Sequence, residues 1–273
     1  MTNSPPAILA EIEMIERLRL QLKDMAHFEV LGESVDGDLR LPIYKITMGN
    51  PDPTVPVLGL IGGVHGLERI GSEVTLALLN SLTQLLLWDK NTQKILENMR
   101  IFFIQTVNPI GILKKTRSNP RGVDLMRNAP VEASGEIPFL LGGHRISSRL
   151  PWFRGVGQQM EPEAQFLVDA IQKEIVQSSV AVTVDFHSGF GWQDQIWFPY
   201  AKTREPIPDL HYLHAFFSLM EATYPHHFYK VEPQAYLTHG DLWDYLYDWN
   251  RQRSPSHGVY LPFCLEMGSW TWL

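Results

Sequence analysis

Cysteine is almost absent from this 273-residue chain: Cys264 is the only one, so no disulfide can form within the chain. Core packing must then supply the stability, as is usual for proteins of a reducing compartment. Long apolar runs are also missing, since the longest, such as residues 55–64, have about ten residues where a bilayer span needs about 20. No early Lys or Arg precedes an apolar stretch, and Glu11, Glu13 and Glu16 interrupt the region where a signal peptide would be hydrophobic. We therefore expect a cytoplasmic protein with no membrane partner.

Basic residues are in short supply as well, with 23 Lys and Arg against 30 Asp and Glu. The net charge of −7 has the wrong sign for a protein that grips phosphate backbones, which excludes nucleic acid as the main partner. Charged residues make up 19% of the chain and hydrophobic ones 44%, which leaves little room for extended disorder. This composition fits one globular domain over residues 1–273. Two domains are possible, but no linker requires them.

Short apolar segments alternate with helical patterns along the chain. Residues 28–48 resemble two strands around a turn at Asp36-Gly37-Asp38, and further strands are expected at 55–61, 101–107, 180–186, 196–200 and 259–265. A surface helix at about 5–25 would begin at Ser4, Pro5 and Pro6. A helix with Val74, Leu78, Leu82 and Leu85 on one side, and helices from 161 to 175, 210 to 223 and 239 to 249, follow. Residues 109–161 should be mostly loop, which at this length is usually functional.

This alternation predicts an α/β fold. It should be a three-layer sandwich in which helices cover both faces of a mixed, largely parallel central sheet. In such sheets, reactive groups gather where loops leave the carboxyl ends of the strands.

Two of the predicted strand ends carry residues that bind metals. His65 and Glu68 follow the strand at 55–61, and Asp185 and His187 close the strand at 180–186. Two imidazoles and one carboxylate form a three-ligand set that leaves a fourth tetrahedral position open for water, as a catalytic zinc requires. Either fragment alone is a weak signal, because a histidine near glycine is usually an ordinary loop residue.

Several motifs in the same order make the combination specific. They are Gly63-Val64-His65-Gly66-Leu67-Glu68, Asn108-Pro109-Ile110-Gly111, Lys115-Thr116-Arg117-Ser118, Gly122-Val123-Asp124-Leu125-Met126-Arg127-Asn128, Glu161-Pro162-Glu163, His187-Ser188 and Leu265-Glu266. From about residue 55 to 268 the chain resembles the zinc carboxypeptidases, the carboxypeptidase A-like metallopeptidases. Carboxypeptidase A is itself a standard example of the ligand set of two histidines and one glutamate.

The resemblance implies a role for each matching residue in hydrolysis. His65, Glu68 and His187 would hold one Zn²⁺ per chain. Asp124 would accept a hydrogen bond from His65 and fix its tautomer. Arg117 would stabilise the oxyanion of a tetrahedral intermediate, and Glu266 would be the general base. The apolar neighbours of Glu266 should desolvate its carboxyl group and raise its pKa.

Two further matches concern the substrate. Arg127 would bind the C-terminal carboxylate of a peptide, and Tyr236 would close over the bound residue. Met126 departs from the family pattern, which has asparagine beside this arginine, and a thioether cannot donate a hydrogen bond to a carboxylate.

Other polar residues have simpler interpretations. Asp185 is interpreted as a capping residue rather than as a partner of His187, and Glu73 as a charge at a helix N-terminus. The pairs His211/His214 and His226/His227 lack a third ligand and are interpreted as surface residues.

The resemblance implies a zinc-dependent metallocarboxypeptidase that releases a C-terminal residue from peptides. Met126 keeps open a deacylase of N-acyl amino acids on the same fold. A third possibility is a non-catalytic protein that keeps the fold and binds a peptide without cleaving it. The sequence makes no prediction of the oligomeric state or of side-chain preference.

Overall fold

A computed structural model describes residues 9–23, 25–233, 235–253 and 258–268. Its centre is an eight-stranded sheet with the strand order β1-β2-β4-β3-β5-β8-β6-β7. The strands are β1 Ala26–Asp36, β2 Leu39–Gly49, β3 Val57–Gly62, β4 Arg100–Ile104, β5 Val180–Ser188, β6 Gln195–Phe198, β7 Lys230–Pro233 and β8 Val259–Met267. Neighbours β4, β3, β5 and β8 run parallel to one another, while the β1–β2, β2–β4 and β6–β8 pairs are antiparallel. The sheet is therefore mixed, as predicted.

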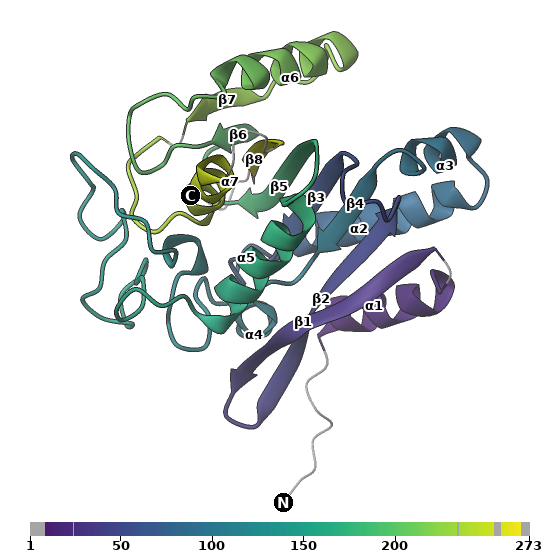
Figure 1. The fold of residues 1–273 in the computed structure, drawn as a ribbon. Coiled ribbons are helices and arrows are strands. Elements are labelled where there is room, and N and C mark those ends of the chain that lie inside the picture. Colours follow the sequence, from purple (N-terminus) through teal and green to yellow (C-terminus); the bar gives the residue numbers. More distant parts are fainter. Residues whose placement is uncertain (1–8, 24, 234, 254–257, 269–273) are drawn as a thin grey trace, which may run out of the picture.

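Helices cover both faces of this sheet (Figure 1). They are α1 Ala10–Gln21, α2 Arg69–Leu86, α3 Lys90–Leu96, α4 Pro109–Lys114, α5 Pro162–Ile175, α6 Leu210–Thr223 and α7 Leu242–Gln252. Helices α5 and α7 share a hydrophobic core with one face, while α1 and α2 pack on the other, where Phe216 of α6 stacks on Phe263 of β8. The predicted three-layer α/β sandwich is confirmed.

The local chemistry explains most of these elements. The hairpin of β1 and β2 turns at Gly37, whose φ of +60° suits glycine. The apolar run of β3 is flanked on both sides by parallel strands, the position in which a strand needs apolar side chains on both faces. Helix α5 buries Leu167, Ile171 and Ile175, the face that the sequence predicts.

The buried side of α2 is not the apolar side that the sequence shows. The apolar side that the sequence shows is largely at the surface, because Leu78 and Leu85 are 41% and 38% exposed, although Leu82 packs against the core. The buried side of the helix combines Leu76 and Leu79 with small residues. A Cβ atom on Gly71 would lie 2.1 Å from the carbonyl oxygen of Phe186 in β5, and Ser72 and Thr75 are fully buried. Close approach to the strands therefore decides which side of α2 is buried.

Other differences are smaller. The N-terminal helix begins at Ala10, while Ser4, Pro5 and Pro6 lie outside the described residues. Helix α3 and strand β7 were not predicted, and the long loop contains α4 and a 3₁₀ turn at Leu125–Arg127. Within the described ranges no single helix is long and apolar enough to cross a bilayer; α2 and α3 meet that criterion only as a pair, which is bent by 112°.

Candidate metal centre

The candidate site lies where β3, β5 and β8 end. Gly63, with a φ of +69°, turns the chain out of β3 toward His65, and a Cβ atom there would lie 2.4 Å from Ser72 Oγ. Glu68 immediately precedes α2, and its side chain makes no hydrogen bond that caps this helix. His187 lies near the end of β5. Parallel pairing of β3 with β5 places these segments side by side, as the strand-end argument predicts.

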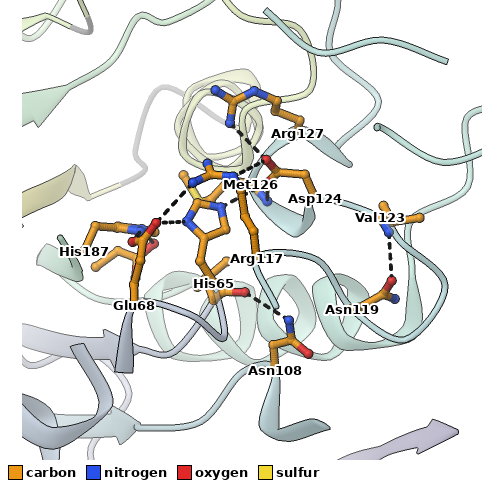
Figure 2. A network of polar contacts seen from close by, with 12 residues as sticks. His65, Glu68, Asn108, Arg117, Asn119, Val123, Asp124, Met126, Arg127 and His187 are labelled. Carbon is orange, nitrogen blue, oxygen red and sulfur yellow. Dashed lines mark hydrogen bonds and ion pairs between the residues drawn. The ribbon is translucent and has the colours of Figure 1, made fainter. Parts of the chain in front are cut away.

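His65, Glu68 and His187 converge. Glu68 Oε1 lies 2.9 Å from His65 Nδ1, and Glu68 Oε2 lies 2.9 Å from His187 Nδ1 (Figure 2). The two imidazole rings have centroids 4.9 Å apart, and the candidate ligand atoms of the three residues all lie within 4.8 Å of one another. All three side chains are buried. One divalent ion can therefore bridge two imidazole nitrogens and a carboxylate here, and this donor set suits zinc.

The second nitrogen of each imidazole meets a carboxylate. His65 Nε2 lies 3.0 Å from Asp124 Oδ1, and His187 Nε2 lies 2.5 Å from Asp185 Oδ2. Trp243 of α7 donates from Nε1 to the same Asp185 oxygen at 3.3 Å. The interpretation of Asp185 as a capping residue is therefore wrong. Residues two apart on a strand share one face, and this brings Asp185 alongside His187. Both carboxylates fix their imidazoles with Nδ1 directed at the centre.

Arg117 joins the two carboxylates of this cluster. Its Nε donates to Asp124 Oδ2 at 2.9 Å and its Nη1 to Glu68 Oε1 at 3.1 Å. Burial alone would raise the pKa of Asp124, but Arg117, His65 and Arg127 together hold this pKa well below its ordinary value. Burial likewise opposes the ionisation of Glu68, yet the two histidines hold its pKa low. Both groups are therefore anionic at neutral pH.

Arg127 lies on the 3₁₀ turn and is 4% exposed. Its Nη2 donates to the Tyr236 hydroxyl at 3.1 Å, its Nε to the Leu141 carbonyl at 3.0 Å and its Nη1 to Asp124 Oδ2 at 3.4 Å. The structure thus brings together the two residues that the resemblance assigns to substrate binding, although 109 positions separate them in the sequence. Met126 lines the same cavity.

Glu266 faces this cavity beside the cluster. Its Oε2 is buried and has no hydrogen-bond partner among the described residues. Burial, with a further contribution from the charge of Glu68, raises the pKa of Glu266 to about 7, while His187, His65 and Arg117 pull it down. A buried acceptor that lacks a donor is costly, so this oxygen fits a donor carried by a bound molecule.

One cavity connects all these groups. It reaches from His65, Glu68 and His187 past Glu266 to Arg127 and Tyr236, and aromatic side chains including Phe190 and Trp197 form its wall. A bound molecule can therefore touch the candidate ligands and Arg127 at the same time.

The other candidate residues form no separate metal site within the described ranges. Among the described residues, the remaining metal-ligand grouping is Asp185, His187 and Cys264, which shares His187 with the first. The pairs His211/His214 and His226/His227 join no such group, and His227 instead lies 3.2 Å from Asp194 Oδ2. Glu73 is exposed and pairs with Arg69 at 3.5 Å. Sequence reasoning allowed that Trp243 could line a substrate pocket but missed its contact with Asp185, which no motif indicates.

The model of the zinc carboxypeptidase family matches residues 11–268. The chain belongs to the zinc carboxypeptidase family. Members of this family use a catalytic zinc ion, and the cluster of His65, Glu68 and His187 is the candidate site for it.

Named relatives agree with this membership. The chain is 32% identical over 103 residues to carboxypeptidase SOL1 of Arabidopsis thaliana, and 32% identical over 114 residues to carboxypeptidase E of Caenorhabditis elegans. Each match covers 37% of this chain but 20% and 24% of these relatives, so the shared part is about a fifth to a quarter of their length.

Solved structures share the fold. Bovine thrombin-activatable fibrinolysis inhibitor, in complex with tick carboxypeptidase inhibitor, superposes with a TM-score of 0.70 at 22% identity and covers 93% of this chain and 83% of its own. Carboxypeptidase A from Helicoverpa armigera gives a TM-score of 0.70 at 16% identity, and the match covers 97% of this chain and 68% of that protein. The zinc carboxypeptidase fold therefore extends over nearly the whole chain.

Proposed function

We propose that this protein is a zinc-dependent metallocarboxypeptidase that hydrolyses the C-terminal amide bond of peptides. The observation that carries the proposal is the shared cavity, in which a cluster of two histidines and one glutamate lies beside Glu266 and the buried Arg127. Glu266 Oε2 has no hydrogen-bond partner in the described part of the chain. Family membership supports the same reaction class.

In this proposal His65 Nδ1, His187 Nδ1 and a carboxylate oxygen of Glu68 hold one zinc ion. Bound zinc supplies a water of lowered pKa and polarises the scissile carbonyl. Asp124 and Asp185 keep the two imidazoles in the required orientation through the Nε2 contacts. Three protein ligands leave a coordination position for water, which a purely structural site would fill with a fourth residue.

Glu266 is the proposed general base. Its Oε2 accepts a proton from the attacking water and later delivers it to the leaving amine. Burial raises its pKa to about 7, so near neutral pH the group can both accept and return a proton. Its lack of a partner among the described residues leaves this oxygen available to the water.

Arg117 is proposed to stabilise the oxyanion. The contacts to Asp124 and Glu68 use its Nε and Nη1, while Nη2 has no hydrogen-bond partner in the described part of the chain. A guanidinium that is already positioned needs no rearrangement when negative charge develops on the carbonyl oxygen.

Arg127 is proposed to bind the substrate's free carboxylate. A carboxylate can replace Tyr236 as the acceptor at Nη2, after which the phenol is free to cover the bound residue. Because Met126 offers no donor beside Arg127, this carboxylate receives fewer hydrogen bonds than in relatives with asparagine there. Met126 keeps open the second candidate, a zinc-dependent deacylase of N-acyl amino acids, and the test therefore includes its substrates.

The test compares three substrate sets on the zinc-loaded full chain. Peptides with free C-termini, the same peptides amidated, and N-acyl amino acids are incubated separately, and released amino acids are identified by mass spectrometry. A carboxypeptidase releases residues from the first set much faster than from the amidated peptides. Preferential hydrolysis of the third set shows a deacylase. Saturable peptide binding without any product shows a non-catalytic binding protein and overturns the proposal.

A further inference from the structure

The segment of residues 115–128 carries three charged groups of the candidate site, namely Arg117, Asp124 and Arg127. Apart from the short 3₁₀ turn at its end, the segment has no helix or strand of its own. Loop backbone without such support is normally mobile. Some other contact must therefore hold Arg117 against Asp124 and Glu68.

Asn119 closes a turn in the middle of this segment. Its side-chain Oδ1 accepts hydrogen bonds from the backbone N–H groups of Arg121 at 3.1 Å and Val123 at 3.0 Å (Figure 2). Its backbone N–H donates to the Val123 carbonyl at 2.9 Å, and Gly122 donates to the Asn119 carbonyl at 2.9 Å. The path from Arg117 to Asp124 is thereby fixed.

The other half of the Asn119 amide attaches this turn to α5. Its Nδ2 donates to Glu161 Oε2 at 2.7 Å and to Glu163 Oε2 at 3.1 Å. Glu163 in turn accepts from Ser34 Oγ of β1 at 2.6 Å. The backbone N–H of Glu161 donates to Asn128 Oδ1 at 2.5 Å, at the far end of the segment. Both the middle and the end of the segment are thus tied to the first residues of α5.

We propose that Asn119 is a positioning residue for Arg117: it acts through Glu161 and Glu163 to keep the guanidinium of Arg117 aimed at the reaction centre. The inference rests on the proposed function. Asn119 is 4% exposed, and all four of its side-chain hydrogen bonds are to groups that define this geometry. Only an amide of this length supplies an acceptor to the turn and a donor to the two carboxylates together.

The charges around Asn119 suggest a decisive substitution. Asn119→Asp keeps the acceptor for the turn but removes the donor and puts a third carboxylate against Glu161 and Glu163. Arg121 Nε pairs with Glu161 Oε2 at 2.5 Å, so the repulsion from the new aspartate falls mainly on Glu163, which has no cationic partner among the described residues. Adding Glu163→Gln returns the cluster to its original net charge and offers a donor to the new aspartate, while the glutamine Oε1 can still accept from Ser34.

The experiment measures kcat, KM and zinc content for wild type, Asn119→Asp, Glu163→Gln and the double variant. Asn119→Asp should lower kcat roughly 10- to 100-fold, because the guanidinium no longer meets the developing oxyanion. KM should change by less than about threefold, since Arg127 still binds the substrate carboxylate. The double variant should recover at least about tenfold in kcat, as expected for residues that act as one coupled unit. Asn98→Asp, an exposed change on the other side of the sheet, is the matched control and should match wild type.

A second readout does not depend on turnover. Amide hydrogen exchange of residues 115–123 should accelerate in Asn119→Asp and slow again in the double variant, while Arg127, next to the Asn128 contact with Glu161, should not change. If Asn119→Asp does not fold, Asn119→Ser replaces it, because serine retains an acceptor but cannot reach the two carboxylates.

The inference is overturned if the Asn119 variant keeps wild-type kcat, or if kcat and folded fraction fall together and the double variant restores neither. A wild-type protein that hydrolyses nothing would instead overturn the proposed function.

Discussion

Glu266 is the register partner of His187: the two residues lie side by side in the parallel strands β8 and β5. The sheet itself therefore sets the separation between a candidate metal ligand and the candidate general base. Because side chains alternate between faces, a register slip of one residue would turn Glu266 away from the cavity. The placement depends on the core of the sheet and on no mobile loop.

Replacing Glu266 with glutamine tests its role as the base. The glutamine side chain has nearly the same shape but cannot accept the proton, so we expect kcat/KM to fall roughly 100- to 10,000-fold. The bound zinc per chain, measured by atomic emission, should stay the same. Glu73→Gln, at an exposed carboxylate of α2, serves as the control. Nearly full activity in the Glu266 variant would remove this residue from the reaction.

Asp185 is expected to matter for zinc affinity, because it holds His187 through Nε2. Asp185→Asn should weaken zinc binding roughly 10- to 100-fold, the usual cost of losing a carboxylate behind a histidine ligand. Competition against a chromophoric chelator measures this constant, with the exposed Asp169→Asn change as control. An unchanged zinc affinity together with lower thermal stability would show that Asp185 stabilises the fold and not the bound metal.

Arg127 should govern recognition of the substrate's free C-terminus. In Arg127→Met the substrate carboxylate loses a charged donor, so kcat/KM for free peptides should drop roughly 10- to 100-fold. Residual hydrolysis of the amidated peptides should not change. Arg149→Met, an exposed arginine outside the cavity, controls for lost surface charge. Equal losses on both kinds of peptide would show that Arg127 has only a structural role.

The raised pKa of Asp241 predicts that the stability of the fold depends on pH. It caps α7, and burial raises its pKa from 3.8 to about 6, although the α7 amides and Arg127 oppose this shift. Since the folded state binds this proton more tightly than the unfolded state, ionisation destabilises the fold above about pH 6. That cost disappears as the pH falls from about 6 to about 4.

An asparagine in place of Asp241 would still cap the helix but could not ionise. Asp241→Asn should therefore raise the free energy of unfolding by about 3 kcal/mol at about pH 8 and by almost nothing at about pH 4. Urea titrations of both proteins at acidic, intermediate and alkaline pH across this range measure the difference. A stability difference that is the same at all these pH values would rule out the ionisation of Asp241 as its cause.

The sequence predicts the central strands and α5 because their burial follows one simple pattern. Residues 55–61 are almost uniformly apolar, and β3 is flanked on both sides by parallel strands. The buried side of α2 could not be predicted in the same way. This helix approaches β5 so closely that Gly71, Ser72 and Thr75 face the sheet, and hydrophobic periodicity gives small polar residues no weight.

Some residues of the candidate site could likewise be assigned from the sequence, and others could not. His65, Glu68 and His187 could be paired from their places after two buried strands. The contact of Arg127 with Tyr236 joins residues 109 positions apart, and only the family resemblance indicated it. Asp185 could have been assigned from strand alternation, since it lies two residues before His187 and so on the same face. Asn119 carries no sequence pattern, because its partners come from the distant first turn of α5.

Anomalous X-ray scattering at the zinc absorption edge, from crystals of the zinc-loaded chain, tests the central claim most directly. We predict one strong peak within about 2.0–2.2 Å of His65 Nδ1, His187 Nδ1 and a carboxylate oxygen of Glu68. A peak at the His226/His227 pair or elsewhere, with none between these three side chains, would contradict the assignment of the metal centre.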